Sequence, residues 1–423
     1  MSENNALVIF GSTGDLTYNK LLPSIARLNE AHPQLLTTVF LVGRQVSHLE
    51  AYLELAQEKG LDISTIASLI PKLRYVNMQA GEASAYPALE QLLSSFTGRF
   101  FYVAMPPSIY WVIADSLVQS KCLLPHDANH RIAFEKPFGE NAAAANVLVQ
   151  LMQSLLDENQ LYRVDHYLAK PMIQALVPLR QSLASFASFF QAPILQSVTV
   201  QAYETLGVLS RGKFYEATGA MNDMIQSHLL FTLTQACAPL PTDESSLDTT
   251  DFLNKLIPQP SKMKLGQYVG YRQEVHVDPE SFVETFAVLP FTHQSPRYQQ
   301  VDFWIATGKK CSQKRTDIIF SFANNAKFRI KIAPDIGVTY NDAFFATCSS
   351  QQKDDLKAMG HQSWKQAEAY ETIFYDFITG DHRLFPSSND ILASWALMEP
   401  FHQQKRIPLP YEHEDDIWQG VSL

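Results

Sequence analysis

The sequence predicts a two-part protein: an N-terminal α/β domain with a Rossmann-like, doubly wound parallel sheet, then an α+β domain with a large, mainly antiparallel sheet. Over residues 1–170, short apolar runs alternate with segments of helical periodicity. That alternation is typical of a parallel sheet covered by helices on both faces. Over residues 171–423, several strand-like runs follow one another without helices between them, which favours an antiparallel sheet.

Short apolar runs define the strands of the first part. We expect these strands at residues 6–10, 38–42, 73–77, 100–105, 132–134 and 161–164. Helical periodicity predicts helices over residues 20–30 and about 142–156. Ligands of doubly wound sheets bind at the carboxyl ends of the strands, so polar residues that follow these runs are candidates for a site.

The second part begins with a helix at Pro171, which suits a first helical position. Helices are also expected over residues 220–236, 364–379 and 389–403, and strands over residues 197–203, 267–271, 281–289, 302–305, 316–322 and 327–332. Residues 239–261, rich in Pro, Ser, Thr and Asp, are expected to form a loop. Residues 411–416 form an acidic tail that we expect to be peripheral.

Bulk composition narrows the class of protein. A chain of 423 residues with 46% hydrophobic residues can bury the cores of two or three domains. Its net charge of −10 argues against broad binding to nucleic acid or to anionic membranes. The four cysteines form no CxxC pair, which indicates a reducing compartment and no zinc site. With no signal peptide and no run of about 18 apolar residues, a cytoplasmic location is expected.

A glycine-containing turn follows the first strand and opens the first helix. Glycine lets the backbone approach a pyrophosphate, and a helix N-terminus favours negative charge. The spacing is GxxG rather than GxGxxG, so a tight turn without a ligand is the alternative. The residues expected to bind a dinucleotide here are Gly11, Ser12, Thr13, Gly14, Asp15 and Leu16.

Arg44 follows the second strand, where a site that selects NAD usually has an acid for the ribose 2′-hydroxyl. An arginine suits a 2′-phosphate instead, so the sequence favours NADP over NAD. The alternative for Arg44 is a solvated loop charge. Pro106 and the Lys136-Pro137 pair lie at the carboxyl ends of two further strands, where they would contact a bound cofactor.

The segment RVDHYLAK at residues 163–170 joins the two parts. It reads as a strand end that runs into a helix start, where free N–H groups favour an anion. With His166, Tyr167 and Lys170 present, a phosphate-binding corner is the hypothesis. Asp165 does not suit a phosphate, so it needs another role, such as orienting a catalytic base.

His228 lies on a largely apolar predicted helix, and a hydrogen-bonded core histidine is the alternative to a catalytic base. The functional interpretation gains from Asp223 near the start of this helix and from Glu204 at the end of the preceding strand. Several polar groups would then converge, as recognition of sugar hydroxyls requires. Lys136 and Lys309 follow strands and are candidates too, with solvated surface charges as the alternative.

These motifs together closely resemble the glucose-6-phosphate dehydrogenase family. The matching segments keep the family's order over almost the whole chain. They are GxxGDLxxxKL at residues 11–21, EKPFG at 135–139, RxDHYLGK at 163–170, the ET-G…GRG-YxE segment at 204–216, GAxRDMxQNH at 219–228, ETF at 284–286, RTGK at 306–309 and YE…GD..LF…W at 370–395.

The resemblance implies oxidation of glucose 6-phosphate at C1 to 6-phosphogluconolactone with hydride transfer to NADP, in the pentose phosphate pathway. His228 would take the proton of the C1 hydroxyl, since an imidazole titrates near neutral pH, and Asp165 would orient it. The 6-phosphate would be bound by His166, Tyr167 and Lys170, the sugar by Glu204, Asp223, Lys136 and Lys309, and the cofactor by Thr13, Arg44, Pro106, Lys136 and Pro137.

The chain departs from the family pattern around the substrate. The substituted positions are Ala169, Pro171, Asn222, Ser227, Ala306 and Ala333. Loss of supporting polar groups loosens a site's geometry, so two alternatives remain: a dehydrogenase of another sugar or sugar phosphate, or a non-catalytic metabolite-binding paralogue. The family also implies a homodimer or homotetramer built through the sheet of the second domain. The implied division is an NADP-binding domain at residues 1–170 and a substrate-binding and oligomerisation domain at residues 171–423.

Overall fold

The structure is a computed structural model that describes residues 4–182, 184–240, 247–360 and 368–418. The chain divides into two compact units. Unit 1 comprises Met1–Ala169 and Ala367–Leu392, and unit 2 comprises Lys170–Gln366 and Ala393–Leu423. The chain therefore leaves unit 1 and returns to it once.

Unit 1 is built on a six-stranded sheet in which every neighbouring pair is parallel. The order is β3 (Leu73–Asn77), β2 (Thr38–Gly43), β1 (Asn5–Phe10), β4 (Gly98–Val103), β5 (His130–Phe134) and β6 (Leu161–Arg163). All residues of β1 are buried, because a central parallel strand is covered on both faces. The predicted Rossmann-like sheet is confirmed, and its strand order reverses beside β1, where such sheets bind ligands.

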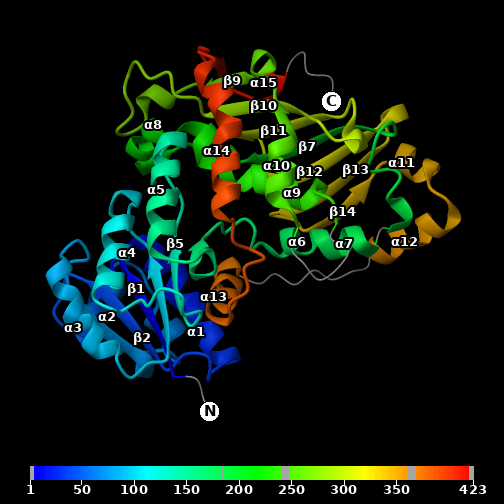
Figure 1. The fold of residues 1–423 in the computed structure, drawn as a ribbon. Coiled ribbons are helices and arrows are strands. Elements are labelled where there is room, and N and C mark those ends of the chain that lie inside the picture. Colours follow the sequence, from blue (N-terminus) through cyan, green and yellow to red (C-terminus); the bar gives the residue numbers. More distant parts are fainter. Residues whose placement is uncertain (1–3, 183, 241–246, 361–367, 419–423) are drawn as a thin grey trace. The chain divides into compact units, whose positions relative to one another are not determined.

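Helices cover both faces of this sheet, with α1 beside α13 and α4 beside α5 (Figure 1). The helices that connect the strands are α1 (Leu22–Ala31), α2 (Leu49–Glu58), α3 (Tyr86–Leu93), α4 (Tyr110–Gln119) and α5 (Ala142–Leu155). The sequence predicted only the first and last of these. It missed the other three, α2, α3 and α4.

Helix α13 (Ala369–Thr379) belongs to the core of unit 1 although it comes late in the chain. Phe374 lies against Tyr102 with ring centroids 4.9 Å apart, and Phe377 lies against Tyr162 at 5.0 Å. The division expected from the sequence places this helix in the second domain. Its apolar face is instead buried by the first sheet, a long-range pairing that no local pattern encodes.

Unit 2 contains a nine-stranded mixed sheet in which most neighbours are antiparallel. The exceptions are β7 with β11 and β9 with β15, which are parallel. The order is β14 (Gly337–Tyr340), β13 (Lys327–Ala333), β12 (Arg315–Phe322), β7 (Leu195–Tyr203), β11 (Asp302–Gly308), β10 (Phe286–His293), β9 (Lys264–Tyr268) and β15 (Leu409–Tyr411), with β8 (Leu256–Pro258) paired to β10. The predicted α+β second part is confirmed.

The helices of unit 2 include a nine-residue π-helix, η9, which continues directly into α9. The others are short, apart from α12 and α14. Their bounds are α6 (Pro171–Gln174), α7 (Leu176–Ser182), α8 (Gly212–Ala220), η9 (Met221–Leu229), α9 (Leu230–Cys237), α10 (Thr249–Lys255), α11 (Asp342–Thr347), α12 (Ser350–Gly360), α14 (Ser388–Gln403) and α15 (Glu414–Trp418). Helix α14 begins in unit 1 and continues into unit 2 at Ala393.

Two expectations for unit 2 were wrong in detail. The loop expected at residues 239–261 contains α10 and β8; residues 241–246 lie outside the described part. A side-chain cap starts α10, because Asp248 accepts the N–H of Asp251 at 2.8 Å. The strands expected at 267–271 and 281–289 are displaced, since β9 ends at Tyr268 and β10 begins at Phe286. Of the helix expected at 364–379, residues 364–367 are outside the described residues.

The acidic tail at residues 411–416 is only partly peripheral: Glu412, His413, Asp415 and Asp416 are exposed, but Tyr411 and Glu414 are buried. Tyr411 is 1% exposed and ends β15, which pairs with β9. Glu414 is buried and accepts the Ser312 N–H at 2.9 Å. Charge composition suggested a solvated end, but these two side chains point inward.

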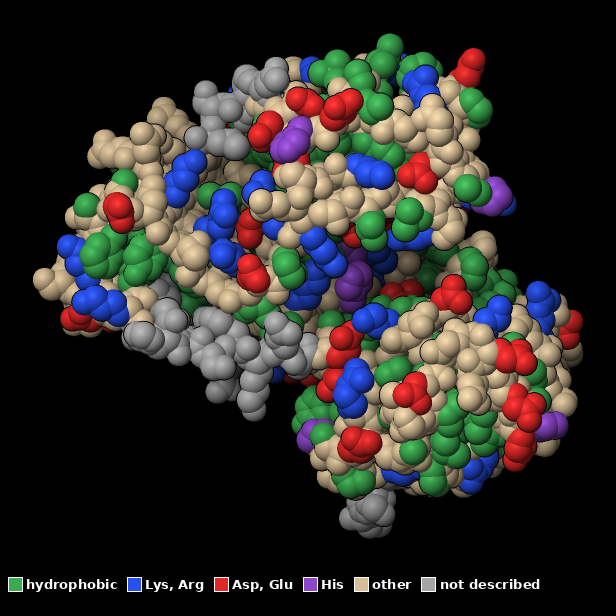
Figure 2. Space-filling model, turned by 180° about the vertical axis from the view of Figure 1, so that it is seen from behind, with side chains coloured by type: hydrophobic (Ala, Val, Ile, Leu, Met, Phe, Trp, Pro, Cys, Tyr) green, Lys and Arg blue, Asp and Glu red, His purple; other side chains and the backbone are tan. Residues whose placement is uncertain are grey.

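No helix within the described ranges is long and apolar enough to cross a membrane. On the face shown in Figure 2, acidic and basic side chains are interspersed over much of the surface. That mixture accords with a chain of 33 basic and 43 acidic residues.

Candidate active site

A pocket opens at the carboxyl ends of the central strands of unit 1. Its empty space, including the part open to solvent, is about 710 Å³. Three predicted cofactor residues line it: Gly11, Thr13 and Arg44. The remaining wall comes from segments that the sequence did not single out: Val42, Gly43, Gln45, Met78, Gln79, Ala80, Gly81, Met105 and Ile109.

Gly11 is required by the shape of the turn after β1. Its φ is +80°, a left-handed conformation that favours glycine. A Cβ at this position would lie 2.2 Å from the Ala104 carbonyl oxygen. The turn and the end of β4 are therefore in close backbone contact. Because Gly11 has no side chain, the pocket that it lines stays open to a ligand.

Ser12 shapes this turn rather than facing the pocket. Its hydroxyl donates to the Val42 carbonyl at 2.9 Å, and its carbonyl accepts the Tyr52 hydroxyl at 2.7 Å. Tyr52 is fully buried on α2, and burial raises the pKa of its phenol. The phenol therefore stays neutral and remains a donor. The sequence missed Tyr52 because α2 itself was missed.

Arg44 lies at the open side of the pocket and is exposed. Its guanidinium donates to the Gln79 side chain at 3.5 Å. No Asp or Glu occurs among the pocket's described lining residues, so none of them supplies the acid that would hold a ribose 2′-hydroxyl. Asp15, at the start of the first helical segment, is also exposed and does not line the pocket.

Pro106 and the Lys136-Pro137 pair follow β4 and β5, two adjacent strands, but do not line this pocket.

Glu135 directly precedes Lys136. Its carboxylate accepts hydrogen bonds from the Tyr102 hydroxyl and, at 3.1 Å, from the Tyr370 hydroxyl. Burial raises the pKa of Glu135 to about 7. The sequence did not identify this cluster, because its members lie on β4, β5 and α13.

Asp165, His166 and Tyr167 directly follow β6 in unit 1. Asp165 is 4% exposed, and its Oδ1 accepts the Tyr167 N–H at 2.9 Å, which fixes the turn. The half-buried His166 ring is stacked on Tyr370 at 6.3 Å with 12° between the ring planes. Two residues of the expected phosphate corner, His166 and Tyr167, therefore lie in unit 1, while Lys170 begins unit 2 as the residue before α6.

In unit 2, the sheet brings Glu204 and Lys309 together. They follow β7 and β11, which are parallel neighbours with Tyr203 paired to Gly308. Parallel neighbours end at the same edge, so the next residues are adjacent. The Lys309 ammonium forms an ion pair with the Glu204 carboxylate and lies 5.5 Å from the centre of the Tyr215 ring.

Tyr215 is a site residue that the sequence did not predict. It is 2% exposed on α8. Burial raises the pKa of its phenol well above the usual value, and the nearby carboxylates of Asp223, Glu284 and Glu204 raise it further. The phenol therefore lies near both the Glu204–Lys309 pair and Asp223.

His228 and Asp223 lie on η9 and are 1% and 7% exposed. π-helices are rare and occur frequently at functional sites. Glu284 holds the start of this segment: its Oε1 accepts the Met221 N–H at 2.9 Å, and burial raises its pKa to about 7. Asn222 Oδ1 and Ser227 Oγ are buried without a hydrogen-bond partner among the described residues.

The predicted residues therefore form two groups. Unit 1 contains the nucleotide pocket, the 136–137 turn and Asp165 with His166 and Tyr167; unit 2 contains Lys170, Glu204, Asp223, His228 and Lys309. Among the residues described, no cluster of His, Cys, Asp and Glu could hold a metal ion. A Rossmann-type pocket in one unit, and buried aspartate, histidine and lysine side chains in the other, are features of a dehydrogenase that binds a nicotinamide dinucleotide.

Comparisons with known proteins define the family. Residues 8–175 match "Glucose-6-phosphate dehydrogenase, NAD binding domain", and residues 177–417 match "Glucose-6-phosphate dehydrogenase, C-terminal domain". The chain belongs to the glucose-6-phosphate dehydrogenase family. The Chlamydia muridarum glucose-6-phosphate 1-dehydrogenase is 30% identical over 94% of this chain and 90% of its own length.

Solved structures agree with this assignment. A crystal structure of glucose-6-phosphate 1-dehydrogenase from Mycobacterium avium matches with a TM-score of 0.84 and 25% identity, over 97% of this chain and 94% of that one. A glucose-6-phosphate dehydrogenase in complex with its substrate glucose-6-phosphate matches with a TM-score of 0.85 and 22% identity, over 97% of this chain and 95% of that one. The latter likeness bears on the fold alone.

Proposed function

We propose that this chain is an NADP-dependent glucose-6-phosphate 1-dehydrogenase, which oxidises glucose 6-phosphate at C1 to 6-phosphogluconolactone in the pentose phosphate pathway. One observation carries the proposal: both halves of the chain match this family, and the residues expected to perform its chemistry lie in those halves. Asp165 and His228 are both nearly fully buried, as a base and its orienting acid should be.

The residues present fit the dinucleotide. Gly11 leaves room where a side chain would collide with Ala104, and the pocket beside it is lined by Thr13 and Arg44. When bound, NADP supplies the hydride acceptor. The chain's own contribution is to hold the cofactor through this turn and to place Lys136 and Pro137 at the end of β5, two strands away from β1 in the same sheet.

In unit 2, Glu204 and Asp223 are proposed to hold sugar hydroxyls, and Lys309 to reach the sugar while paired with Glu204. His228 takes the proton of the C1 hydroxyl as the hydride leaves, with Asp165 as its orienting acid. His166, Tyr167 and Lys170 are proposed to bind the 6-phosphate, since imidazole, phenol and ammonium groups can all donate to phosphate oxygens.

The test is a steady-state assay of NADPH formation with glucose 6-phosphate, alongside a panel of other sugars and sugar phosphates. We expect the highest kcat/KM for glucose 6-phosphate. A higher kcat/KM for another sugar would identify that sugar as the substrate instead. Binding without turnover under every condition would indicate a non-catalytic paralogue.

Replacing the base should remove chemistry but not cofactor binding. In His228→Ala, kcat should fall by about 10²–10⁴-fold, the usual contribution of general base catalysis, while the Kd for NADP stays unchanged. His402→Ala, which removes an exposed histidine of the same unit, is the matched control. Equal kcat in the two variants would exclude His228 as the base.

The preference for NADP is proposed to depend on Arg44. A charge-assisted contact contributes about 1.5–3 kcal/mol, so Arg44→Ala should lower kcat/KM for NADP by about 10- to 100-fold and leave that for NAD nearly unchanged. Arg74→Ala is the control, because Arg74 is an exposed arginine on β3 of the same unit. If both cofactors lose equally, Arg44 does not read the 2′-phosphate.

A second candidate, a dehydrogenase of another sugar or sugar phosphate, is favoured by the buried Asn222 Oδ1 and Ser227 Oγ, which lack partners among the described residues. Such atoms could form hydrogen bonds with a hydroxyl that is placed differently from those of glucose 6-phosphate.

A cytoplasmic location is proposed because the four cysteines are free. A homodimer or homotetramer stays a prediction, which light scattering on the purified protein would test.

A further inference from the structure

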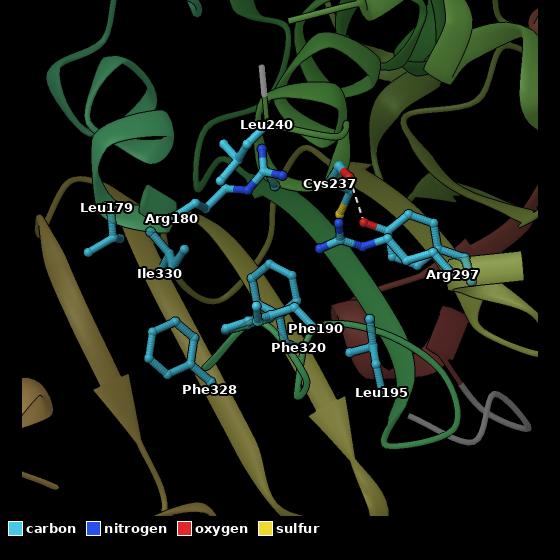
Figure 3. Close-up of a pocket in the computed structure, with 13 residues that line it drawn as sticks. Leu179, Arg180, Phe190, Leu195, Cys237, Leu240, Arg297, Phe320, Phe328 and Ile330 are labelled. Atoms are coloured by element: carbon cyan, nitrogen blue, oxygen red, sulfur yellow. Dashed lines mark hydrogen bonds between the residues drawn. The ribbon is translucent and has the colours of Figure 1, made fainter. Parts of the chain in front are cut away.

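A second cavity lies in unit 2, between the sheet and the helices that cover one of its faces. Its empty space, including the open part, is about 610 Å³. Most of its wall is apolar. The side chains of Phe320, Phe328 and Ile330 rise from β12 and β13, and Leu179, Ala187, Phe190, Leu195, Ala236 and Leu240 complete the apolar wall (Figure 3).

Two arginines interrupt this apolar wall. Arg180 comes from α7 and Arg297 from the turn before Tyr298, and their guanidinium ends reach the middle of the cavity from opposite sides (Figure 3). No Asp or Glu is among the cavity's described lining residues. Two like charges that face one space of low polarity repel each other unless an anion lies between them.

Arg180 caps a helix, whereas Arg297 interacts with its neighbour Tyr298. The Arg180 guanidinium donates to the carbonyl oxygens of Gln235, at 2.8 Å, and Ala238, so it caps the end of α9. Arg297 lies over the Tyr298 ring at 5.5 Å, and its Nε is buried without a hydrogen-bond partner in the described part of the chain. Burial lowers the pKa of Arg180, and the charge of Arg297 lowers it further.

We propose that this cavity binds a small amphipathic carboxylate, such as a medium-chain fatty acid, with its carboxylate between Arg180 and Arg297 and its tail against the phenylalanines of β12 and β13. Guanidinium groups match carboxylates in geometry and charge, and the apolar wall stabilises a hydrocarbon tail. The site does not depend on the dehydrogenase activity, because every residue that forms it lies outside the residues assigned to catalysis and to the cofactor.

The first test uses calorimetric titration of the full-length protein with decanoate, hexanoate, acetate and decanol. Each buried methylene should strengthen binding by up to about fourfold, so decanoate should bind more tightly than hexanoate, and acetate should not bind measurably. Decanol, which keeps the tail but lacks the charge, should bind at least tenfold more weakly than decanoate. Equal affinity for decanol and decanoate, or no binding of decanoate, would overturn the proposal.

Variants locate the site. Arg297→Gln should weaken decanoate binding by about 10- to 100-fold, the loss expected for a charged hydrogen bond. Arg329→Gln is the matched control: it removes the same charge from β13, between Phe328 and Ile330, where alternation directs the side chain to the other face of the sheet. Arg297 is chosen over Arg180 because Arg180 also caps α9. Equal binding by both variants, with unchanged thermal unfolding, would contradict the assignment.

Discussion

At the scale of single residues, Glu135 has the most unusual environment in unit 1. It directly precedes Lys136 and accepts two phenol hydroxyls, from Tyr102 and Tyr370. The Tyr110 hydroxyl donates to its backbone carbonyl at 2.6 Å. Burial raises the pKa of its carboxyl from 4.5 to about 7, and Asp165 raises it further while Lys136 lowers it. The residue therefore changes charge near neutral pH beside a turn proposed to contact the cofactor.

This environment makes stability depend on pH. An acid whose pKa is raised by folding binds its proton more tightly in the native state than in the unfolded state. The folded protein therefore becomes less stable as the pH rises and that proton is lost. From pH 4.5 to about 7, unfolded Glu135 is ionised while the folded residue still holds its proton. One pKa unit corresponds to about 1.4 kcal/mol. As the pH rises through this window, the free energy of unfolding of the wild type should therefore fall by up to about 3 kcal/mol relative to that of Glu135→Gln.

Urea unfolding of wild type and Glu135→Gln at several pH values measures this difference. Glu90→Gln on α3 serves as the control, because the Glu90 side chain is 32% exposed and the variant should show no such trend. A constant difference between wild type and Glu135→Gln across the window would contradict the raised pKa.

At the scale of elements, helix α13 is as much a part of the nucleotide-binding unit as the helices that connect its strands. Phe377 is fully buried and contacts Phe100, Tyr102 and Tyr162 through ring edges. Arg131 on β5 donates to the carbonyl oxygens of Phe377, at 3.0 Å, and Ile378, at 2.6 Å, which satisfies the end of the helix. A late segment thus completes a fold that begins at the N-terminus.

Truncating this contact should destabilise unit 1. In Phe377→Ala, the free energy of unfolding should fall by about 3–5 kcal/mol, as for other buried aromatic residues, and affinity for NADP should fall with it. Tyr375→Ala, on the same helix but 40% exposed, should cost less than about 1 kcal/mol. Chemical denaturation followed by tryptophan fluorescence measures both, and similar losses for the two variants would mean that α13 is not part of this core.

At the scale of the whole molecule, the protein keeps four buried, free thiols in two units. Burial raises the pKa of Cys122 to about 11 and those of Cys237 and Cys311 to about 12. Since the thiolate is the reactive form, all three should be inert in the native state.

The prediction is therefore that native protein reacts slowly with Ellman's reagent, at a rate limited by opening of the structure, while all four thiols react at once in denaturant. Absorbance at pH 8 measures the kinetics. Rapid reaction of any thiol in protein that still shows its native circular dichroism spectrum would contradict the described burial of the cysteines.

The sequence by itself determined the strands of the first sheet, the strands β7, β11, β12 and β13 of the second, the turn at Gly11 and the identity of the candidate residues, because periodicity and short motifs are local. It placed Glu204 and Lys309 only at the ends of two distant strands. Their ion pair depends on β7 and β11 being parallel neighbours, which only the assembled sheet decides. The same holds for Glu135, held by phenols from β4 and α13, and for Tyr215 beside Asp223. Hydrophobic periodicity encodes which face of an element is buried, but not which distant element covers it.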